Sequence, residues 1–231
     1  MSKLYDMLQP NGIGRDAFIK LLTENGLRLK KVRNYTRTTY QHPSARYPNL
    51  ISGSTLTNIN QVWVSDITYV RAGGRFYYLT MIMDVYSRRI LGWSLSKTLE
   101  AKSNLSALRM ALRRRRGHDL SELVHHSDRG SQYIEKNYVK ALASRGIKIS
   151  MGNKAWENAH AEKINDTIKN YYINPHGPIS WEQTLRLTKK AIVLYNQERP
   201  HDSLQKATPN QYENFLLGLA PRERPDYVIN Y

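Results

Sequence analysis

The chain has 231 residues, with 35 Lys and Arg against 19 Asp and Glu, a net charge of +16 and no cysteine. Its length fits one large domain or one domain with a small appendage, and its charge favours a polyanionic partner, usually nucleic acid. The composition excludes a disulfide framework, a cysteine nucleophile and a zinc site built on cysteine, and no apolar run approaches the roughly 18 residues of a membrane helix.

The N-terminal fifty residues combine a short helix with a basic connection. Residues 15–25 predict the helix, because they carry an apolar stripe and Gly26 follows as a C-terminal stop. The next stretch, residues 28–49, is basic, rich in Thr and Tyr, and interrupted by Pro43 and Pro48. This composition predicts an extended arm or linker.

Three strands are predicted next. Residues 62–70 alternate between two sets of β-forming side chains, which is typical of a strand with at least one buried face. Gly73 and Gly74 then predict a hairpin turn. Residues 76–84 and 89–95 predict the second and third strands.

The remaining elements alternate between helices and strands. The predicted order is a helix over 101–116, a strand over 123–126, a helix over 133–145, a strand over 147–151, helices over 158–172 and 181–198, and a last short helix that starts at Thr208-Pro209. Each later strand follows a helix, so it is expected to run parallel within the same sheet. We therefore predict a three-layer α/β domain with a mixed five-stranded sheet and short helical extensions at both ends. The order of elements resembles the ribonuclease-H-like arrangement.

The positive charge is concentrated in two zones. Residues 1–50 carry nine basic and three acidic side chains, and residues 101–150 carry eleven and four. Residues 51–100 and 151–200 are closer to balance, with an excess of two basic side chains each. An acidic pocket inside a basic molecule is typical of a metal site that meets phosphate.

Three acids stand out as candidates for chemistry. Asp66 interrupts the apolar strand VWVSDITYV, where a carboxylate costs several kcal/mol unless it is paired, solvated or bound to metal. Asp128 follows a predicted strand, where ligands of α/β sheets bind, although it could instead cap a helix. Glu162 shares a helical face with Asp166 and Lys169, which a solvated face of paired charges would also explain.

Together these acids indicate a site for hard divalent cations. Such ions prefer several carboxylate oxygens together with water and phosphate. Two of them can activate the attacking oxygen and stabilise the leaving oxygen of a phosphodiester, so that no protein nucleophile is required.

The chain resembles the transposases of insertion sequences of the IS-three family, which share the catalytic core of retroviral integrases. The resemblance runs in order over about residues 12–213, and it rests on the segments WVSDITYV (63–70), MDVYSRRILGWSLS (83–96), HHSDRGSQY (125–133), ISMGNKAWENAHAEKIN (149–165) and QERPHDSLQKATPNQY (197–212). It implies that Asp66, Asp128 and Glu162 are the catalytic acids and that they bind two Mg²⁺ or Mn²⁺ ions.

The resemblance also suggests roles for other residues. Lys169 falls where these enzymes have a basic residue that touches the DNA end. Asp84 resembles a structural acid outside the triad, and its sequence context allows pairing with Arg88 or Arg89. Trp156, in the loop before the helix of Glu162, is a candidate for stacking on DNA.

Two basic runs are candidates for contact with the DNA backbone. The first run contains Arg28, Lys30, Lys31 and Arg33, and the second contains Arg113, Arg114, Arg115 and Arg116. A solvated linker is the alternative for the first run, and favourable interaction with the helix dipole is the alternative for the second.

Two departures from the family pattern are visible. The 33 residues between Asp128 and Glu162 are slightly fewer than is usual, and a loop deletion of this size is generally tolerated. The region ahead of the core is shorter than the family's usual helix-turn-helix region. This favours a second reading-frame product with an upstream-frame partner protein, a shortened copy or a mis-assigned start.

We therefore expect three parts and one activity. Residues 1–50 form a partial DNA-binding segment and basic linker, residues 55–175 the catalytic core, and residues 176–231 a helical extension. The expected activity is metal-dependent DNA cleavage and strand transfer by a homo-oligomer on DNA, in the bacterial cytoplasm near the nucleoid and without a membrane partner. The alternatives are a ribonuclease-H-fold nuclease or resolvase, and a catalytically silent DNA-binding fragment.

Overall fold

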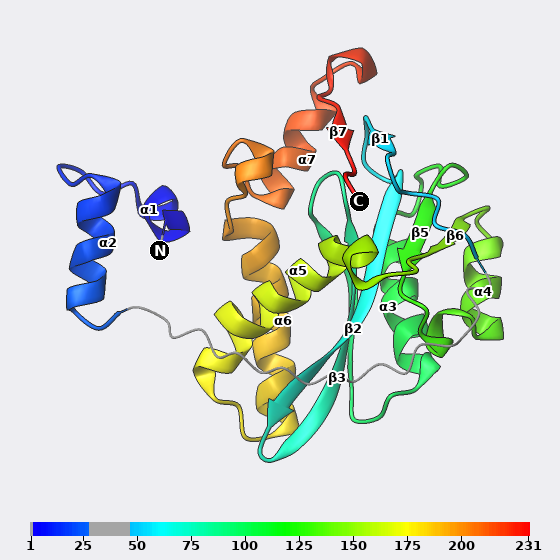
Figure 1. Ribbon diagram of the computed structural model, residues 1–231, viewed down its shortest axis with the longest axis horizontal. Helices are drawn as coiled ribbons and strands as arrows, with labels where there is room; N and C mark the ends of the chain where they lie inside the picture. Colours follow the sequence, from blue (N-terminus) through cyan, green and yellow to red (C-terminus); the bar gives the residue numbers. More distant parts are fainter. Residues whose placement is uncertain (1, 28–46) are drawn as a thin grey trace.

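The computed structural model describes residues 2–27 and 47–231, and a five-stranded sheet lies at its centre (Figure 1). The strands are β2 (Val62–Ala72), β3 (Arg75–Asp84), β4 (Ile90–Ser96), β5 (Val124–Ser127) and β6 (Lys148–Met151). They lie in the order β4-β3-β2-β5-β6. β2, β3 and β4 are antiparallel neighbours, whereas β5 runs parallel to β2 and β6 runs parallel to β5. The predicted mixed sheet is confirmed.

Helices cover both faces of this sheet (Figure 1). They are α3 (Ala101–Arg114), α4 (Lys136–Ala143), α5 (Ala159–Thr167) and α6 (Trp181–Glu198). Val62 and Val64 of β2 pack in one apolar cluster with α5 and α6, whereas Trp63 packs in a second cluster with α3 and α4. Because side chains of a strand alternate between faces, Asp66 shares the face of Val64 and points toward the α5 layer.

The β2–β3 turn confirms the hairpin that Gly73 and Gly74 predict. Both glycines have positive φ, +55° and +75°, a conformation that other residues rarely adopt. A Cβ on Gly73 would lie 2.1 Å from the carbonyl oxygen of Ile179. The turn therefore also needs glycine because it touches the backbone just ahead of α6.

Two helices differ from their predicted extents. The helix expected over 158–172 is α5 followed by a π-helix, η3 (Ile168–Ile173). The wider turn lets Ile168 and Ile173, five positions apart, both reach the core, where each is fully buried. The helix expected from residue 133 begins only at Lys136, because Glu135 caps it by accepting hydrogen bonds from two backbone amides.

The chain ends add small elements around the central domain. At the N-terminus lie α1 (Ser2–Leu8) and the predicted α2 (Arg15–Glu24), drawn in blue in Figure 1. Toward the C-terminus, α7 (Pro209–Leu217) begins with the predicted Thr208 cap, and a two-stranded sheet joins β1 (Thr55–Leu56) to β7 (Tyr227–Val228). In the described ranges, 2–27 and 47–231, no helix is long and apolar enough to span a bilayer.

Asp84, at the end of β3, has a structural role, but the pairing expected for it is wrong. Its buried carboxylate accepts hydrogen bonds from the backbone amides of Asn60, Tyr86 and Ser87, at 2.6, 3.0 and 3.0 Å. Tyr86 and Ser87 reach the carboxylate because the chain turns back immediately after β3, and Asn60 reaches it from the segment just before the neighbouring strand β2. Arg88 instead contacts His160, and Arg89 pairs with Glu213.

Candidate active site

Asp66 and Asp128 lie side by side where β5 ends next to the middle of the parallel strand β2. The β2–β5 register pairs Ser65 with Ser127, so each aspartate comes one position beyond that pair. Neighbouring strands are about 4.8 Å apart, which brings the two half-buried side chains into the same region. This is the edge where ligands of such sheets bind, at the carboxyl end of β5.

Helix α5 brings Glu162 to the same edge. Two asparagines fasten the helix to β2: Asn165 donates a hydrogen bond to the Asp66 carboxylate at 2.8 Å, and Asn158 donates to the Ser65 carbonyl at 3.1 Å. Both asparagines are buried, whereas Glu162 is exposed at the surface of the first turn. The helix therefore presents a free carboxylate next to two held ones.

The three carboxylates influence one another electrostatically. Burial raises the pKa of Asp66 to about 8, and the negative charges of Asp128 and Glu162 add to this rise. The pKa of Asp128 is raised by burial, and that of Glu162 by burial and by the charge of Asp128. The arrangement thus accumulates negative charge that favours either a shared proton or a cation.

A buried tyrosine and a tight loop lie next to the two aspartates. Tyr133 is buried, its hydroxyl lies 3.1 Å from Ser65 Oγ, and burial and the charges of Asp128 and Asp66 raise its pKa well above the usual value. The Gly130 amide donates a hydrogen bond to Asp128 Oδ1 at 3.0 Å. A Cβ on Gly130 would lie 3.0 Å from that same oxygen, so glycine lets the loop fold closely around the carboxylate.

Lys169 is the residue predicted to contact the DNA end. It lies on η3, and burial lowers its pKa, while the negative charges of Asp166 and Asp66 oppose that change. Its ammonium is therefore in the electrostatic field of the acid cluster. Contact with DNA stays a prediction.

The carboxylate oxygens of the three acids suit a hard cation, but the side chains are not yet arranged to bind the same ion. In the part of the chain that the structure describes, no three His, Cys, Asp or Glu side chains form a group that could hold one ion as they stand. Asp66 and Asp128 are held by neighbouring amides, so Glu162 is the member whose side chain is free to turn toward them. Carboxylate oxygens are the ligands that Mg²⁺ prefers.

The four arginines of the run Arg113–Arg116 differ in exposure and in their partners. Arg113 and Arg116 are exposed, and Arg114 donates a hydrogen bond to the Ile90 carbonyl at 3.0 Å. Arg115 corrects the prediction for this run, since it is only 4% exposed and forms an ion pair with Glu213. It points inward because the helix turn that exposes its neighbours directs it toward α7. The other predicted basic residues, Arg28, Lys30, Lys31 and Arg33, lie outside the described residues.

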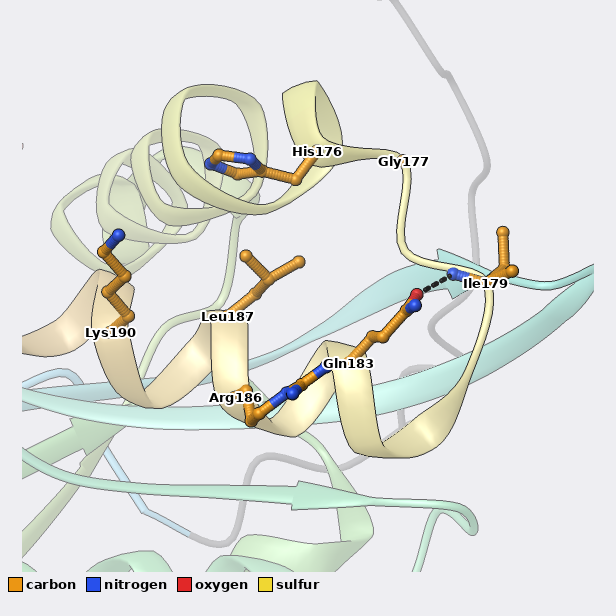
Figure 2. Close-up of a pocket in the computed structure, with 7 residues that line it drawn as sticks. All are labelled: His176, Gly177, Ile179, Gln183, Arg186, Leu187 and Lys190. Atoms are coloured by element: carbon orange, nitrogen blue, oxygen red, sulfur yellow. Dashed lines mark hydrogen bonds between the residues drawn. The ribbon is translucent and has the colours of Figure 1, made fainter.

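A groove on α6 is a separate surface feature, and Figure 2 shows its lining. Its volume is about 410 Å³, and it is lined by His176, Gly177, Ile179, Gln183, Arg186, Leu187 and Lys190. Gln183 accepts a hydrogen bond from the Ile179 amide at 3.0 Å, which ties the loop to the helix. The charged side chains of the lining are basic, and none of the three candidate acids takes part in it.

Several residues of the site were not predicted from the sequence. Asn165 could have been found, because it is a polar side chain at a position in the apolar stripe of α5 that also contains Ala161, Ile164 and Ile168. Tyr133 gave no such signal, since its place depends on the 3₁₀ turn η1 (Ser131–Tyr133). Trp156, predicted to stack on DNA, is 57% exposed, and Lys154 Nζ lies 4.7 Å from its ring centre.

Comparison with known proteins identifies the class of fold first. Two family models, both described as integrase core domain, match residues 57–155 and 145–209. The magnesium complex of the HTLV-2 integrase catalytic core aligns with 71% of this chain and 99% of its own, at a TM-score of 0.52 and 20% identity. A chain of the simian T-cell lymphotropic virus intasome in complex with the PP2A regulatory subunit B56 gamma aligns with 100% of this chain and 77% of its own, at a TM-score of 0.59 and 16% identity.

Sequence relatives then give the family. A 31 kDa protein of insertion element IS600 from Shigella sonnei is 34% identical over 90% of this chain and 78% of its own length. The putative IS986/IS6110 transposase of Mycobacterium tuberculosis H37Rv is 32% identical over 92% and 79%, and the Escherichia coli K12 transposase InsF of IS3A is 32% identical over 84% and 68%. The chain belongs to the insertion-sequence transposases with an integrase core domain, the family that includes the IS3 transposase.

Proposed function

We propose that this chain cleaves DNA at the ends of an insertion sequence and joins those ends to target DNA, with Asp66, Asp128 and Glu162 as its metal-binding catalytic acids. Water would attack a phosphodiester at the transposon end and leave a 3′ hydroxyl. That hydroxyl would then attack a target phosphodiester, so that one P–O bond forms as another breaks. The exchange needs no protein nucleophile and no external energy source.

The observation that carries this proposal is the gathering of three acids from three separate elements of an integrase-type core. Asp66 comes from β2, Asp128 from the end of β5 and Glu162 from α5. Burial raises the pKa of Asp66 and of Glu162; the charges of Asp128 and Glu162 add to the rise at Asp66, and that of Asp128 to the rise at Glu162. The buried Glu213 forms ion pairs with Arg89 and Arg115, unlike Asp66, Asp128 and Glu162. These three have no ion-pair partner among the described residues.

A divalent cation fits the chemistry of these residues. Two Mg²⁺ or Mn²⁺ ions, when bound, would activate the attacking oxygen and stabilise the leaving oxygen. The protein's part is orientation: Asn165 fixes the Asp66 carboxylate, the Gly130 amide fixes Asp128, and Glu162 turns from the helix surface to complete the set. The cation would also neutralise the repulsion that raises the pKa of Asp66.

We further propose that DNA lies across the basic residues around this edge. Lys169 would contact the DNA end, and Arg113 and Arg116 would contact backbone phosphates. Arg28, Lys30, Lys31 and Arg33 would also contact the DNA backbone. As in the viral intasome that the fold resembles, the working unit would be an assembly on DNA, here a homo-oligomer on paired ends. An upstream-frame partner protein stays a prediction.

Strand transfer on labelled end DNA with Mg²⁺ tests the proposal. The wild type is expected to give both cleaved and joined products, and Asp128→Asn is expected to give neither while binding DNA as before. Cleavage without joining would favour a ribonuclease-H-fold nuclease or resolvase. Salt-dependent binding with no metal-dependent product would favour a silent DNA-binding fragment, and undiminished activity of Asp128→Asn would refute the assignment of the acids.

A further inference from the structure

The C-terminal strap, which we define as Arg224–Tyr231, lies against the first turn of α5. We propose that this strap positions Glu162 by clamping His160, two residues ahead of it on the same helix. The inference rests on the proposed role of Glu162 as a catalytic acid. It assigns a function to a segment outside the predicted catalytic core, residues 55–175. The clamp consists of His160, Arg88 and Tyr227.

Three contacts define the clamp. The Arg88 guanidinium lies 2.8 Å from His160 Nδ1 and 4.5 Å from the centre of the Tyr227 ring. The Tyr227 hydroxyl lies 3.3 Å from His160 Nε2. Because a guanidinium only donates, Nδ1 must accept, so the imidazole proton is on Nε2 and Tyr227 accepts from it. The imidazole is therefore held on both sides by groups whose hydrogen-bonding roles match.

The strap is itself firmly attached to the domain. Ile229 is fully buried in the core, and its backbone exchanges hydrogen bonds with Gly53 and Ser54 at 3.0 and 2.9 Å. Next to it, β7 pairs with β1, and the Tyr86 hydroxyl donates to the Pro225 carbonyl at 2.6 Å. A segment held by core burial and by the main chain can act as a fixed support.

Arg88 reaches the clamp through the β3–β4 turn. It is only 8% exposed and has a positive φ of +60°, which is unusual for a residue other than glycine. The turn is held by Asp84, whose carboxylate accepts from the amides of Tyr86 and Ser87. The structural acid of β3 thus fixes the backbone that presents Arg88 to α5.

The clamp acts on Glu162 through the helix. Residues two apart on a helix project to opposite sides, so His160 is held on one side while Glu162 faces the other acids. No hydrogen bond within residues 2–27 and 47–231 restrains the Glu162 carboxylate itself. Its position therefore depends on the helix, which Asn165 fastens at the Asp66 side and the clamp fastens at its first turn.

Tyr227→Ala tests the clamp, with Val228→Ala as the matched control. Val228 is the next residue of the same short strand and is 45% exposed, so its loss shortens a side chain without touching His160. Hydrogen exchange should quicken in residues 159–167 of Tyr227→Ala but not in residues 101–114, and Val228→Ala should match the wild type. Unchanged exchange in residues 159–167 would overturn the clamp.

A kinetic measurement separates positioning from a merely structural role. With labelled end DNA, Tyr227→Ala should lower kcat about tenfold and raise the half-saturating Mn²⁺ concentration several-fold, while KM for DNA stays the same. Loss of a residue that orients a metal ligand typically costs about 10–100-fold in metal affinity or activity. Tyr227→Phe, which keeps the ring over Arg88, should recover part of this loss.

The outcomes distinguish the clamp from the function on which it rests. Faster exchange with unchanged kcat and Mn²⁺ dependence would overturn the positioning role. A wild type without metal-dependent products would instead refute the proposed function, and the exchange result alone would then decide the clamp.

Discussion

Two sites with acidic side chains in this chain are built in opposite ways. Glu213 of α7 is met by two arginines: Arg115 Nη1 donates to it at 3.0 Å and Arg89 also pairs with it, while Ser87 donates at 2.7 Å. These partners lower its pKa in spite of burial. Asp66, in contrast, lies next to two other acids, and burial together with their negative charges raises its pKa to about 8.

The difference shows that the neighbours of a carboxylate indicate whether its role is structural or functional. A buried acid with cationic partners ties elements together, here α3, α7 and the β3–β4 turn. An acid held by amides beside other acids carries a cost that a cation would remove, and such perturbed groups gather at functional sites.

Neutralising an acid of the Asp66 group should abolish activity without unfolding the protein. Asp66→Asn keeps the shape of the side chain and replaces a carboxyl whose ionisation is already opposed by burial and by the neighbouring acids, so thermal stability should be maintained or increase. The cleavage rate should fall roughly a thousandfold, which corresponds to about 4 kcal/mol of lost transition-state stabilisation. Thermal unfolding and cleavage kinetics on the same preparation check this, and a rate within tenfold of the wild type would contradict it.

Neutralising Glu213 should do the reverse. Glu213→Gln leaves Arg115 buried without its counter-charge, and breaking such a pair costs about 3–5 kcal/mol of unfolding free energy. The control is Glu122→Gln, because the Glu122–Lys148 pair is exposed and exposed pairs contribute little. Urea unfolding measures both, and equal stability of the two variants would show that the Glu213 cluster is not a structural tie.

A buried histidine beneath the site should make the fold sensitive to acid. His125 is fully buried against Tyr138, whose hydroxyl lies 2.9 Å away, and burial lowers its pKa to about 3. An unfolded chain takes up this proton near its ordinary value of about 6.5, so stability is complete above that pH and falls as the pH decreases toward 3. From pH 7 to pH 5 the loss from this residue should be about 2 kcal/mol.

Urea unfolding at several pH values measures this loss. His125→Gln should reduce the pH dependence by this amount, whereas His118→Gln, at an exposed position, should leave it as in the wild type. An unchanged slope in His125→Gln would mean that other groups govern acid unfolding.

The smallest effect is expected within the arginine run. Arg113→Gln and Arg116→Gln should each weaken DNA binding for all sequences and reduce the salt dependence, by about 0.9 in the slope of log K against log salt concentration. Arg115→Gln should instead destabilise the fold. Binding titrations at several salt concentrations check this, and unchanged slopes in both exposed variants would place the DNA elsewhere.

The sheet and its flanking helices could be predicted because they follow periodic patterns. The alternation of β2 and the apolar stripe of α6 are local features, and the predicted strand directions followed from the helices between β2, β5 and β6. β1 and β7 could not be predicted, because each has two residues and exists only through pairing with a segment far away in sequence. The π-turn of η3 likewise depends on where Ile168 and Ile173 meet the core.

The site was predictable at the level of single residues but not of their supports. Asp66 stood out because a charge interrupts an apolar strand, and the structure places it beside Asp128, with Glu162 within electrostatic reach. The roles of Arg115 and His160 depend on partners about a hundred and about seventy residues away, Glu213 and Arg88, which no local pattern reveals.

Mn²⁺ binding followed by electron paramagnetic resonance tests the central claim most directly, because it needs no DNA. Wild-type protein should bind Mn²⁺ saturably, Asp66→Asn and Asp128→Asn should bind it at least about tenfold more weakly, and Glu122→Gln should bind it like the wild type. Equal binding by the wild type and the two Asn variants would contradict a metal site at these acids.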